Sequence, residues 1–343
     1  MLGIGVIGYG YWGPNLVRNF MEVGSARVAA VCDLRPDRLA QVKARYPTIE
    51  TTKDYRDIIR NPAIAAIVIA TPVSGHFDLA MAALRAGKHV LLEKPLTATV
   101  EQAKRLLDEA GRSGRILMVD HTFVYTSAVR KIKEVVESGD LGEIYYYDSV
   151  RVNLGLFQHD VNVLWDLAVH DLSIMGYVIL AQPCAVSATG MSHVPGEPEN
   201  VAFLTLFFEN RLIAHMHVNW LAPVKVRRTL IGGSHKMIVY DDLEPSEKLK
   251  IYDKGITFNN NPENVYQMLI DYRMGDMWAP QLDLTEALRT EALHFIRCIE
   301  NSVPPITSGL EGLRVVQILE AATRSMAQRG HPVEWDATEI AEK

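Results

Sequence analysis

The chain has 343 residues, enough for about two domains and for a core that needs no disulfide or metal. Hydrophobic residues make up 48% and charged residues 22%, which is typical of a globular protein and excludes a disordered or fibrous one. The net charge of −6 disfavours nucleic acid as a partner, and no apolar run approaches the roughly 18 residues that span a bilayer.

The first 120 residues alternate short apolar runs with amphipathic segments. The apolar runs are predicted strands: Leu2–Ile7, Val28–Cys32, Ile64–Ala70, His89–Leu92 and Ile116–Val119. The amphipathic segments are predicted helices: Pro14–Glu22, Arg38–Arg45, Phe77–Ala86 and Val100–Gly111. The runs are rich in β-branched residues and almost wholly apolar, as in strands buried on both faces. Residues 1–120 are therefore predicted to form an α/β domain with a doubly wound parallel sheet.

After residue 120 the pattern changes to longer strands with tight connections. The predicted strands are Ile144–Val152, Cys184–Met191, Val201–Phe208, Leu212–Trp220, Lys225–Ile231 and Met237–Asp241. The predicted helices are Ser127–Ser138, Leu164–Leu180, Thr285–Glu300 and Leu310–Arg329. This order predicts a second domain over residues 121–343 with a large, mostly antiparallel sheet. Residues 243–285 are mixed and polar, and either an active-site or oligomer arm or an ordinary surface excursion fits them.

The cysteines and the N-terminus indicate the compartment. Cys32, Cys184 and Cys298 are far apart and form no CxxC pair, so neither a disulfide framework nor a zinc site is predicted. The apolar N-terminus lacks a basic region and becomes glycine-rich, as a strand entering a turn does and a signal peptide does not. A cytoplasmic location is the expectation.

Residues 5–13 read GVIGYGYWG and contain a GxGxxG motif between the first strand and the first helix. In a dinucleotide site Gly8 permits the tight turn, Gly10 lets the backbone approach the pyrophosphate, and Gly13 allows close packing of helix and strand. Asp33 follows the second strand, where a carboxylate binds the adenosine ribose and repels a 2′-phosphate. NAD is therefore favoured over NADP, although Arg35 could stack on adenine or accept a phosphate.

Lys94 follows the fourth predicted strand in the segment LLEKPL. Ligands in this fold class bind at the carboxyl ends of the strands, so Lys94 is expected near the nicotinamide. There it could take the proton of a substrate hydroxyl as hydride leaves. Pro95 stiffens the turn that presents the lysine. The alternative is an ordinary solvated lysine after a strand.

Asp166 and His170 are four residues apart on one predicted helix, so they share a face beside an apolar stripe. The pair is either a polar site or a hydrogen-bonded core pair. Metal ligation is not predicted, because further ligands would have to come from His76, His121 and His159 through folding alone.

These features together resemble the Gfo/Idh/MocA oxidoreductase family. The resemblance rests on the glycine motif, on RAGKHVLLEKPL at 85–96, on the Asp166/His170 helix and on ITSG at 306–309. It implies an N-terminal Rossmann domain, and a C-terminal α/β domain whose open sheet makes a homodimer or homotetramer. It also implies that Lys94 is the catalytic lysine, that His170 donates or accepts a proton, and that Asp166 contacts a substrate hydroxyl or orients the site. Many relatives carry a Gly-Gly pair where this chain has NVLW at 162–165.

Segments 8–20 and 153–171 are most similar to the branch that acts on nucleotide sugars. Relatives there oxidise the 3-hydroxyl of UDP-N-acetylglucosamine or of its uronic acid. This resemblance suggests a sugar pocket with Arg151, Asn153 and Gln158. It also suggests a diphosphate contact through Lys225, Arg227 and Arg228, for which a solvated strand face is the alternative.

The candidate residues fall into two sets and include no metal ligand. The cofactor set is Gly8, Gly10, Tyr11, Trp12, Gly13, Asp33, Leu34, Arg35, Thr71, Pro72, His76, Glu93 and Lys94. The substrate set is Lys94, His121, Tyr125, Arg151, Asn153, Gln158, Asp166 and His170.

The function expected first is an NAD-dependent dehydrogenase that acts on a sugar hydroxyl, at C3 of a nucleotide-linked hexosamine or its uronic acid. The alternatives are a free-sugar or inositol dehydrogenase using NAD(P) and a glycosidase that oxidises its substrate transiently. A dinucleotide-binding regulator is a third class, which the paired Lys94 and His170 argue against.

Overall fold

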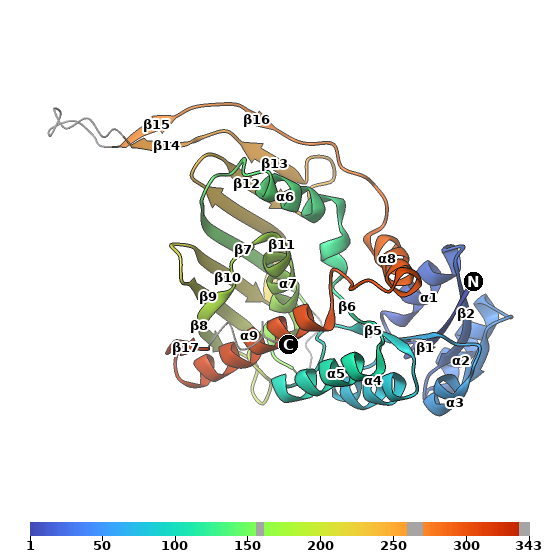
Figure 1. Ribbon diagram of the computed structural model, residues 1–343. Helices are drawn as coiled ribbons and strands as arrows, with labels where there is room; N and C mark the ends of the chain where they lie inside the picture. Colours follow the sequence, from blue (N-terminus) through green and yellow to red (C-terminus); the bar gives the residue numbers. More distant parts are fainter. Residues whose placement is uncertain (156–160, 259–269, 336–343) are drawn as a thin grey trace. The chain divides into compact units, whose positions relative to one another are not determined.

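The computed structural model describes residues 1–155, 161–258 and 270–335 (Figure 1). The chain divides into two compact units. The first contains Met1–Thr126 and Leu284–Glu320, and the second contains Ser127–Asp283 and Ala321–Lys343. The assignment of all residues from 121 to 343 to one domain is corrected here. Helix α8 (Ala287–Asn301) returns to the first unit because its apolar face packs on α1 (Gly13–Glu22), where Phe295 meets Phe20 edge to face.

The first unit is built on a parallel sheet that has six strands within the described ranges. They are β1 (Leu2–Ile7), β2 (Ala26–Cys32), β3 (Glu50–Thr52), β4 (Ala66–Ile69), β5 (His89–Glu93) and β6 (Leu117–Asp120). Their order is β3-β2-β1-β4-β5-β6. The order reverses between β1 and β4, and ligands of such sheets bind at the carboxyl ends beside that reversal. The glycine turn after β1, Asp33 after β2 and Lys94 after β5 all lie at this edge.

The helices of the first unit begin and end where local residues dictate. Besides α1 and α8 they are α2 (Pro36–Arg45), α3 (Tyr55–Arg60), α4 (His76–Arg85) and α5 (Val100–Ser113), with the short 3₁₀ turns η1 (Val73–Gly75) and η2 (Thr122–Tyr125). Proline stands in the first turn of both α1 and α2. The Thr99 hydroxyl accepts the Gln102 backbone N–H and so begins α5, which ends at Gly114 with φ of 61°.

Two elements of the first unit were not predicted from the sequence. Strand β3 is a three-residue edge strand with the sequence Glu-Thr-Thr, so it carries no apolar run. Helix α3 has six residues, too few for a periodic pattern, and Asp54 begins it by accepting the Arg56 backbone N–H. Both elements are too short to show a periodic pattern, although Ile58 of α3 is buried in the core.

The second unit is built on a sheet of nine strands, counted over the residues that the structure describes. They are β7 (Ile144–Leu154), β8 (Pro183–Met191), β9 (Val201–Phe208), β10 (Ile213–Asn219), β11 (Leu221–Gly233), β12 (Met237–Asp241), β13 (Leu249–Tyr252), β16 (Met277–Trp278) and β17 (Val333–Glu334). Their order is β16-β13-β12-β11-β7-β10-β9-β8-β17. Neighbours pair antiparallel except β7 and β10, which run parallel. The predicted α/β fold with a large, mostly antiparallel sheet is confirmed.

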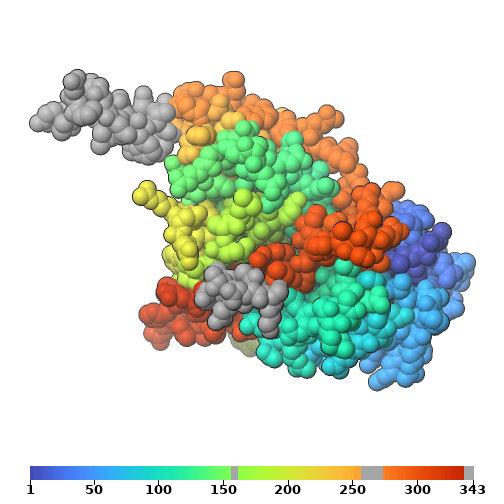
Figure 2. Space-filling view, viewed as in Figure 1, coloured from blue at the N-terminus to red at the C-terminus, as the bar shows by residue number. Residues whose placement is uncertain are grey.

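Helices cover one face of this sheet, as Figure 1 shows for α6 (Ser127–Glu137) and α7 (Val169–Val178). In Figure 2 the atoms of these two helices lie on the face of the second unit turned to the viewer. Side chains of β9 alternate accordingly, because Leu204 and Leu206 are buried while Phe203 and Phe207 are 41% and 37% exposed. The sheet therefore has a covered face and an open face. Helix α9 (Gly309–Ala327) contributes residues to both units.

Residues 243–285, for which no elements were predicted from the sequence, contain strands. Strands β13 and β16 extend the nine-stranded sheet, and β14 (Gly255–Phe258) pairs with β15 (Ile270–Arg273) in a separate two-stranded sheet (Figure 1). Arg273 donates from Nη1 to the Asp253 carboxylate at 2.6 Å, which ties this small sheet to the end of β13. Within the described residues, every helix is too short or too polar to cross a bilayer.

Candidate active site

The glycine turn has the shape that a dinucleotide needs. Gly8 has φ of 98°, and a Cβ there would lie 2.4 Å from the Ala70 carbonyl oxygen. A Cβ on Gly13 would lie 2.3 Å from the Gly8 carbonyl oxygen, so helix and strand pack at glycine distance. A Cβ on Gly10 would meet nothing within 4 Å. That open space beside the backbone is where a pyrophosphate fits, at the start of α1.

Asp33 is held at the end of β2 by the glycine turn. Its Oδ2 accepts the Tyr9 backbone N–H at 2.7 Å, and its Oδ1 accepts the Arg35 backbone N–H at 2.9 Å. The Arg35 guanidinium lies 3.8 Å from Oδ1, yet this side chain is 52% exposed whereas that of Asp33 is 10% exposed. The fixed carboxylate suits a ribose diol. Tyr11 and Leu34, two predicted cofactor residues, flank this edge with exposed side chains.

Three residues of the predicted cofactor set follow β4: Thr71, Pro72 and His76. The Thr71 hydroxyl is buried and has no hydrogen-bond partner, as expected of a group that awaits a ligand. His76 is buried, with Nε2 at 2.8 Å from the Thr71 carbonyl oxygen and Nδ1 at 2.9 Å from the Pro95 carbonyl oxygen. Burial lowers the pKa of His76. His76 therefore links the turn after β4 to the lysine turn, and this corrects its predicted place as a direct cofactor contact.

Lys94 is half-buried in the turn after β5, between Glu93 and a cis peptide bond to Pro95. His121 follows β6, the neighbouring strand, and its ring is 1% exposed with no hydrogen-bond partner at either nitrogen. Burial and the charge of Lys94 lower the pKa of His121 to about 3. The first unit thus holds a lysine and a neutral, unsatisfied imidazole at one sheet edge.

Tyr125 does not belong to this edge. Its hydroxyl lies 2.9 Å from the Thr307 hydroxyl, which donates to the Val119 carbonyl at 2.7 Å, and its ring packs against His294. The side chain is 3% exposed, and burial raises its pKa well above the ordinary value. The prediction that Tyr125 binds substrate is corrected, because Tyr125 is a core residue that joins η2 to the segment before α9.

In the second unit, Asp166 lies beside the parallel strands β7 and β10. Trp220, one residue beyond β10, donates from Nε1 to the Asp166 carboxylate at 3.1 Å. Gly155, just beyond β7, donates its backbone N–H to the Trp220 carbonyl and packs against the Trp220 ring. Asn153 is half-buried near the same strand end. Parallel strands bring their carboxyl ends to one edge, so Asp166 and Asn153 belong to one polar region that Trp220 orders.

Asp166 lies in the π-helical turn η3 (Leu164–Ala168), and His170 lies in the first turn of α7. The Asn162 carboxamide oxygen accepts the Leu164 and Trp165 backbone N–H groups and so begins the turn. Single π turns occur often at functional sites. His170 is half-buried, so its ring is not sealed in the core of the unit.

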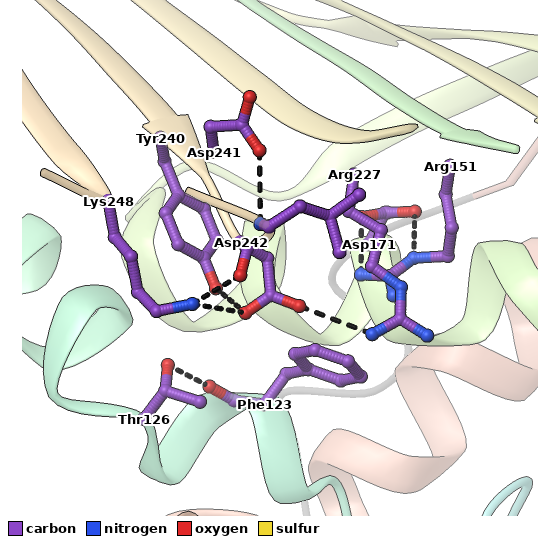
Figure 3. Close-up of polar contacts among 10 residues, drawn as sticks. Phe123, Thr126, Arg151, Asp171, Arg227, Tyr240, Asp241, Asp242 and Lys248 are labelled. Carbon is purple, nitrogen blue, oxygen red and sulfur yellow. Dashed lines mark hydrogen bonds and ion pairs between the residues drawn. The ribbon is translucent and has the colours of Figure 1, made fainter. Parts of the chain in front are cut away.

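The residue after His170 carries a buried ion pair. Arg151 of β7 donates from Nε and Nη2 to the two carboxylate oxygens of Asp171, at 2.8 and 3.0 Å (Figure 3). Both side chains are 4% exposed. Arg151 was predicted to line the sugar pocket. Its guanidinium instead lies inside the unit, where it joins α7 to the sheet next to His170, and the prediction is corrected on this ground.

The three basic residues of β11, Lys225, Arg227 and Arg228, do not form one surface. Arg227 and Arg228 are neighbours on a strand, so their side chains point to opposite faces. Arg227 pairs with Asp242 at 3.2 Å, an acid that also accepts from the Tyr240 hydroxyl (Figure 3). Lys225 and Arg228 are exposed. Arg227 and Arg228 therefore do not share one face of the sheet, and the diphosphate contact stays a prediction.

The predictions that remain concern Gln158 in the sugar pocket and the absence of a metal site. Gln158 and His159 lie outside the described residues. Among the histidines, cysteines, aspartates and glutamates that the structure describes, no group of three or more could hold a metal ion. Trp220, Asp120 and Glu291 were not predicted from the sequence. Asp120 ends β6, which was a signal for a role at the sheet edge, whereas Glu291 stands on an apolar helix face with nothing in the sequence to mark it.

The comparisons with known proteins agree with this geometry. The oxidoreductase family with an NAD-binding Rossmann fold matches residues 2–121, and the Gfo/Idh/MocA C-terminal domain matches residues 129–239. The class that fold and site define is therefore an NAD-binding oxidoreductase. The chain belongs to the Gfo/Idh/MocA family, and the resemblance seen in its motifs is confirmed at the level of the family.

Three known proteins show the range of its relatives. An inositol 2-dehydrogenase from Saccharopolyspora erythraea is 30% identical over 67% of this chain and 71% of its own length. A UDP-N-acetylglucosamine 3-dehydrogenase from Acidithiobacillus ferrooxidans is 26% identical over 91% of this chain and 93% of its own length. A levoglucosan dehydrogenase solved with NADH and levoglucosan has a TM-score of 0.83 and 22% identity, covering 97% of this chain and 99% of the other. That structure supports the fold.

Proposed function

We propose that the protein oxidises a secondary hydroxyl on the ring of a sugar or cyclic polyol, with NAD as the hydride acceptor. The observation that carries the proposal is Lys94 at the carboxyl end of β5, in a sheet whose glycine turn and Asp33 fit a dinucleotide. The relatives named for inositol, for UDP-N-acetylglucosamine and for levoglucosan are all dehydrogenases of ring compounds. The expected substrate is a nucleotide-linked hexosamine or its uronic acid, oxidised at C3.

Lys94 is the proposed base. When bound, NAD accepts a hydride from the carbinol carbon, and the hydroxyl proton must leave at the same time. Lys94 takes that proton in its unprotonated form and then returns it to solvent. The neutral His121 beside it offers a ring nitrogen as a hydrogen-bond partner for a substrate hydroxyl.

His170 and Asp166 are the proposed substrate residues of the second unit. The Asp166 carboxylate, oriented by the Trp220 indole, accepts a hydrogen bond from a ring hydroxyl. His170 exchanges a proton with the reacting hydroxyl as the partner of Lys94. Asn153 contributes an amide that binds a neighbouring hydroxyl.

A substrate panel tests the proposal. The protein is mixed with NAD and, in separate reactions, with inositols, free hexoses, UDP-linked and dTDP-linked hexosamines and their uronic acids, and NADH absorbance is followed. The proposal expects NADH in proportion to product with at least one ring compound, highest for a UDP-hexosamine. A matched control is Lys104→Ala, which removes an exposed lysine on α5 and should leave the rate unchanged.

The other outcomes identify the alternatives. Turnover with inositol or a free sugar alone would overturn the nucleotide-sugar substrate and keep the dehydrogenase. Cleavage of a glycoside without accumulated NADH would establish the transient oxidation of a glycosidase. NAD binding without turnover on any of these compounds would favour the regulator.

We also propose a homodimer or homotetramer formed through the open face of the nine-stranded sheet. That face carries Phe203, which stacks on the His217 ring with centroids 4.5 Å apart, and Phe207, which pairs with Ile213 across β9 and β10. Exposed aromatic groups in a cluster are typical of an interface.

The cysteines are free thiols, which suits a reducing compartment such as the cytoplasm.

A further inference from the structure

Two buried carboxyl groups meet behind the NAD-binding edge of the first unit. Asp120 ends β6 and is 2% exposed, and Glu291 lies on α8 and is 0% exposed. The Glu291 carboxyl faces Asp120 and Thr122, and the charge of Glu93 at the end of β5 also acts on it. Two adjacent carboxylates in a desolvated site cannot both stay ionised, so the pair must hold a proton.

The hydrogen-bond donors decide which acid keeps the charge. Asp120 accepts the Trp12 indole N–H at 2.9 Å on Oδ2 and the Thr122 hydroxyl on Oδ1. Neither oxygen of Glu291 has a partner at full hydrogen-bond geometry, although Asp120 and Thr122 are near enough to act on its carboxyl group. A carboxylate that accepts two donors is favoured as the ion, whereas a buried carboxyl without donors is favoured as the neutral acid.

Trp12 connects this pair to the cofactor. It stands between Gly10 and Gly13 and precedes the first residue of α1, so its backbone is part of the turn that faces the pyrophosphate. Its indole is held from behind by Asp120. Asp120 therefore holds the side chain of a residue that belongs to the glycine turn.

We propose that Glu291 is a neutral acid that keeps Asp120 as an ionised acceptor for Trp12, and that this pair is the positioning element of the glycine turn in NAD binding. The proposal needs only the NAD-binding fold and no particular substrate. Glu291 and Asp120 are positioning residues, because they act on the cofactor through Trp12.

The pH dependence follows from the charges around Glu291. Burial, then Asp120, then Glu93 raise the pKa of Glu291 well above its ordinary value of 4.5, and Tyr125 from η2 also faces it. The folded protein thus binds this proton more tightly than the unfolded chain does. The protonated Glu291 carboxyl contributes fully to the free energy of unfolding below pH 4.5. This contribution is lost as the pH rises through the raised pKa of Glu291. NAD affinity should fall over the same pH range, since a negative charge on Glu291 repels the Asp120 carboxylate.

The test measures the dissociation constant of NAD by calorimetry as a function of pH, without substrate. Wild-type affinity should fall as the pH rises, whereas Glu291→Gln, which cannot ionise, should match the wild type near neutral pH and stay constant. Glu291→Met removes the same titration with an apolar side chain and should also give a flat profile. Glu300→Gln, an exposed position on the same helix, is the control and should follow the wild type.

A second arm tests the link through Trp12. Asp120→Asn and Trp12→Phe should each weaken NAD about tenfold, and the double variant should be no weaker than either, as expected when both changes remove one charged hydrogen bond. Trp278→Phe, at an exposed tryptophan on β16, should leave the NAD dissociation constant unchanged.

An infrared spectrum gives an independent signature. The wild type near neutral pH should show the carbonyl stretch of a protonated carboxyl that Glu291→Gln lacks. Three results would each overturn the proposal: the same pH profile in the wild type and in both Glu291 variants, unchanged NAD affinity in Asp120→Asn and Trp12→Phe, or no protonated carboxyl band assigned to Glu291.

Discussion

At the scale of single residues, the environment decides what each histidine does. His76 and His121 are both buried at the carboxyl edge of the first sheet. His76 has backbone carbonyl groups at both ring nitrogens and links two turns, whereas His121 has no partner at either nitrogen. A buried polar group without a partner is costly in a folded protein, so His121, unlike His76, gains stability from any ligand that supplies a hydrogen bond.

Cofactor choice should follow Asp33. Asp33→Ala removes a carboxylate that binds the ribose and repels a 2′-phosphate, so NAD affinity should fall about ten- to hundredfold and NADP affinity much less. The measurement is a titration with each cofactor, with Asp37→Ala on the exposed start of α2 as the control. If the wild type prefers NADP, Arg35 is the determinant.

Lys94→Ala should separate binding from chemistry. Removing a positioned proton acceptor should lower kcat by about 10²–10⁴ while NAD still binds nearly as in the wild type. His170→Ala should also lower kcat, by less, because water substitutes for a group that only exchanges a proton. Steady-state kinetics and a parallel NAD titration distinguish these effects. An unchanged kcat in Lys94→Ala would contradict its role as the base.

At the scale of elements, the beginning of α7 combines a π turn with a buried ion pair. The turn carries Asp166, and Asp171 binds Arg151 of the sheet. The π turn before His170 and the ion pair after it fix the start of α7. The backbone of His170 is therefore held between two fixed neighbours along the chain.

Breaking that pair should destabilise the protein strongly. Arg151→Met leaves the buried Asp171 carboxylate without its cation, which costs about 3–5 kcal/mol of unfolding free energy. Arg228→Met on the same sheet changes an exposed side chain and should stay within about 0.5 kcal/mol of the wild type. Urea denaturation measures both. Equal stabilities would show that the ion pair contributes no net stability.

At the scale of the whole molecule, the open face of the nine-stranded sheet is the unusual feature. Its covered face buries Leu204, Leu206 and Met216, and its open face presents Phe203 and Phe207 to solvent. Exposed aromatic side chains on a sheet face are stabilised when a second chain covers them.

The oligomer should depend on these two phenylalanines. Phe203→Glu with Phe207→Glu places charges in the proposed interface and should raise the dissociation constant of the oligomer about thirtyfold or more. Light scattering during gel filtration measures the mass. Leu180→Glu, which changes an exposed leucine outside the sheet, should leave the mass unchanged. A monomeric wild type would contradict the proposed oligomer.

The sequence alone determined the architecture and the cofactor edge. Apolar runs with short spacing specify parallel strands, and GxGxxG followed by an acid after the second strand specifies a dinucleotide turn, because both depend on local patterns. The order of the motifs was enough to indicate the family. Short elements such as β3 and α3 were not predicted, since they have too few residues for a periodic pattern.

Only the tertiary structure decided which polar residues face a ligand and which face each other. Arg151 and Tyr125 read as site residues in the sequence, yet each has a partner in the core that is distant along the chain: Asp171 and Thr307. The sequence predicted only that Glu291 is part of a helix. Folding brings it to Asp120, on a strand about 170 positions earlier. Periodicity predicts which side of an element is buried, but the pairing of buried charges depends on contacts between elements, and those exist only after the chain has folded.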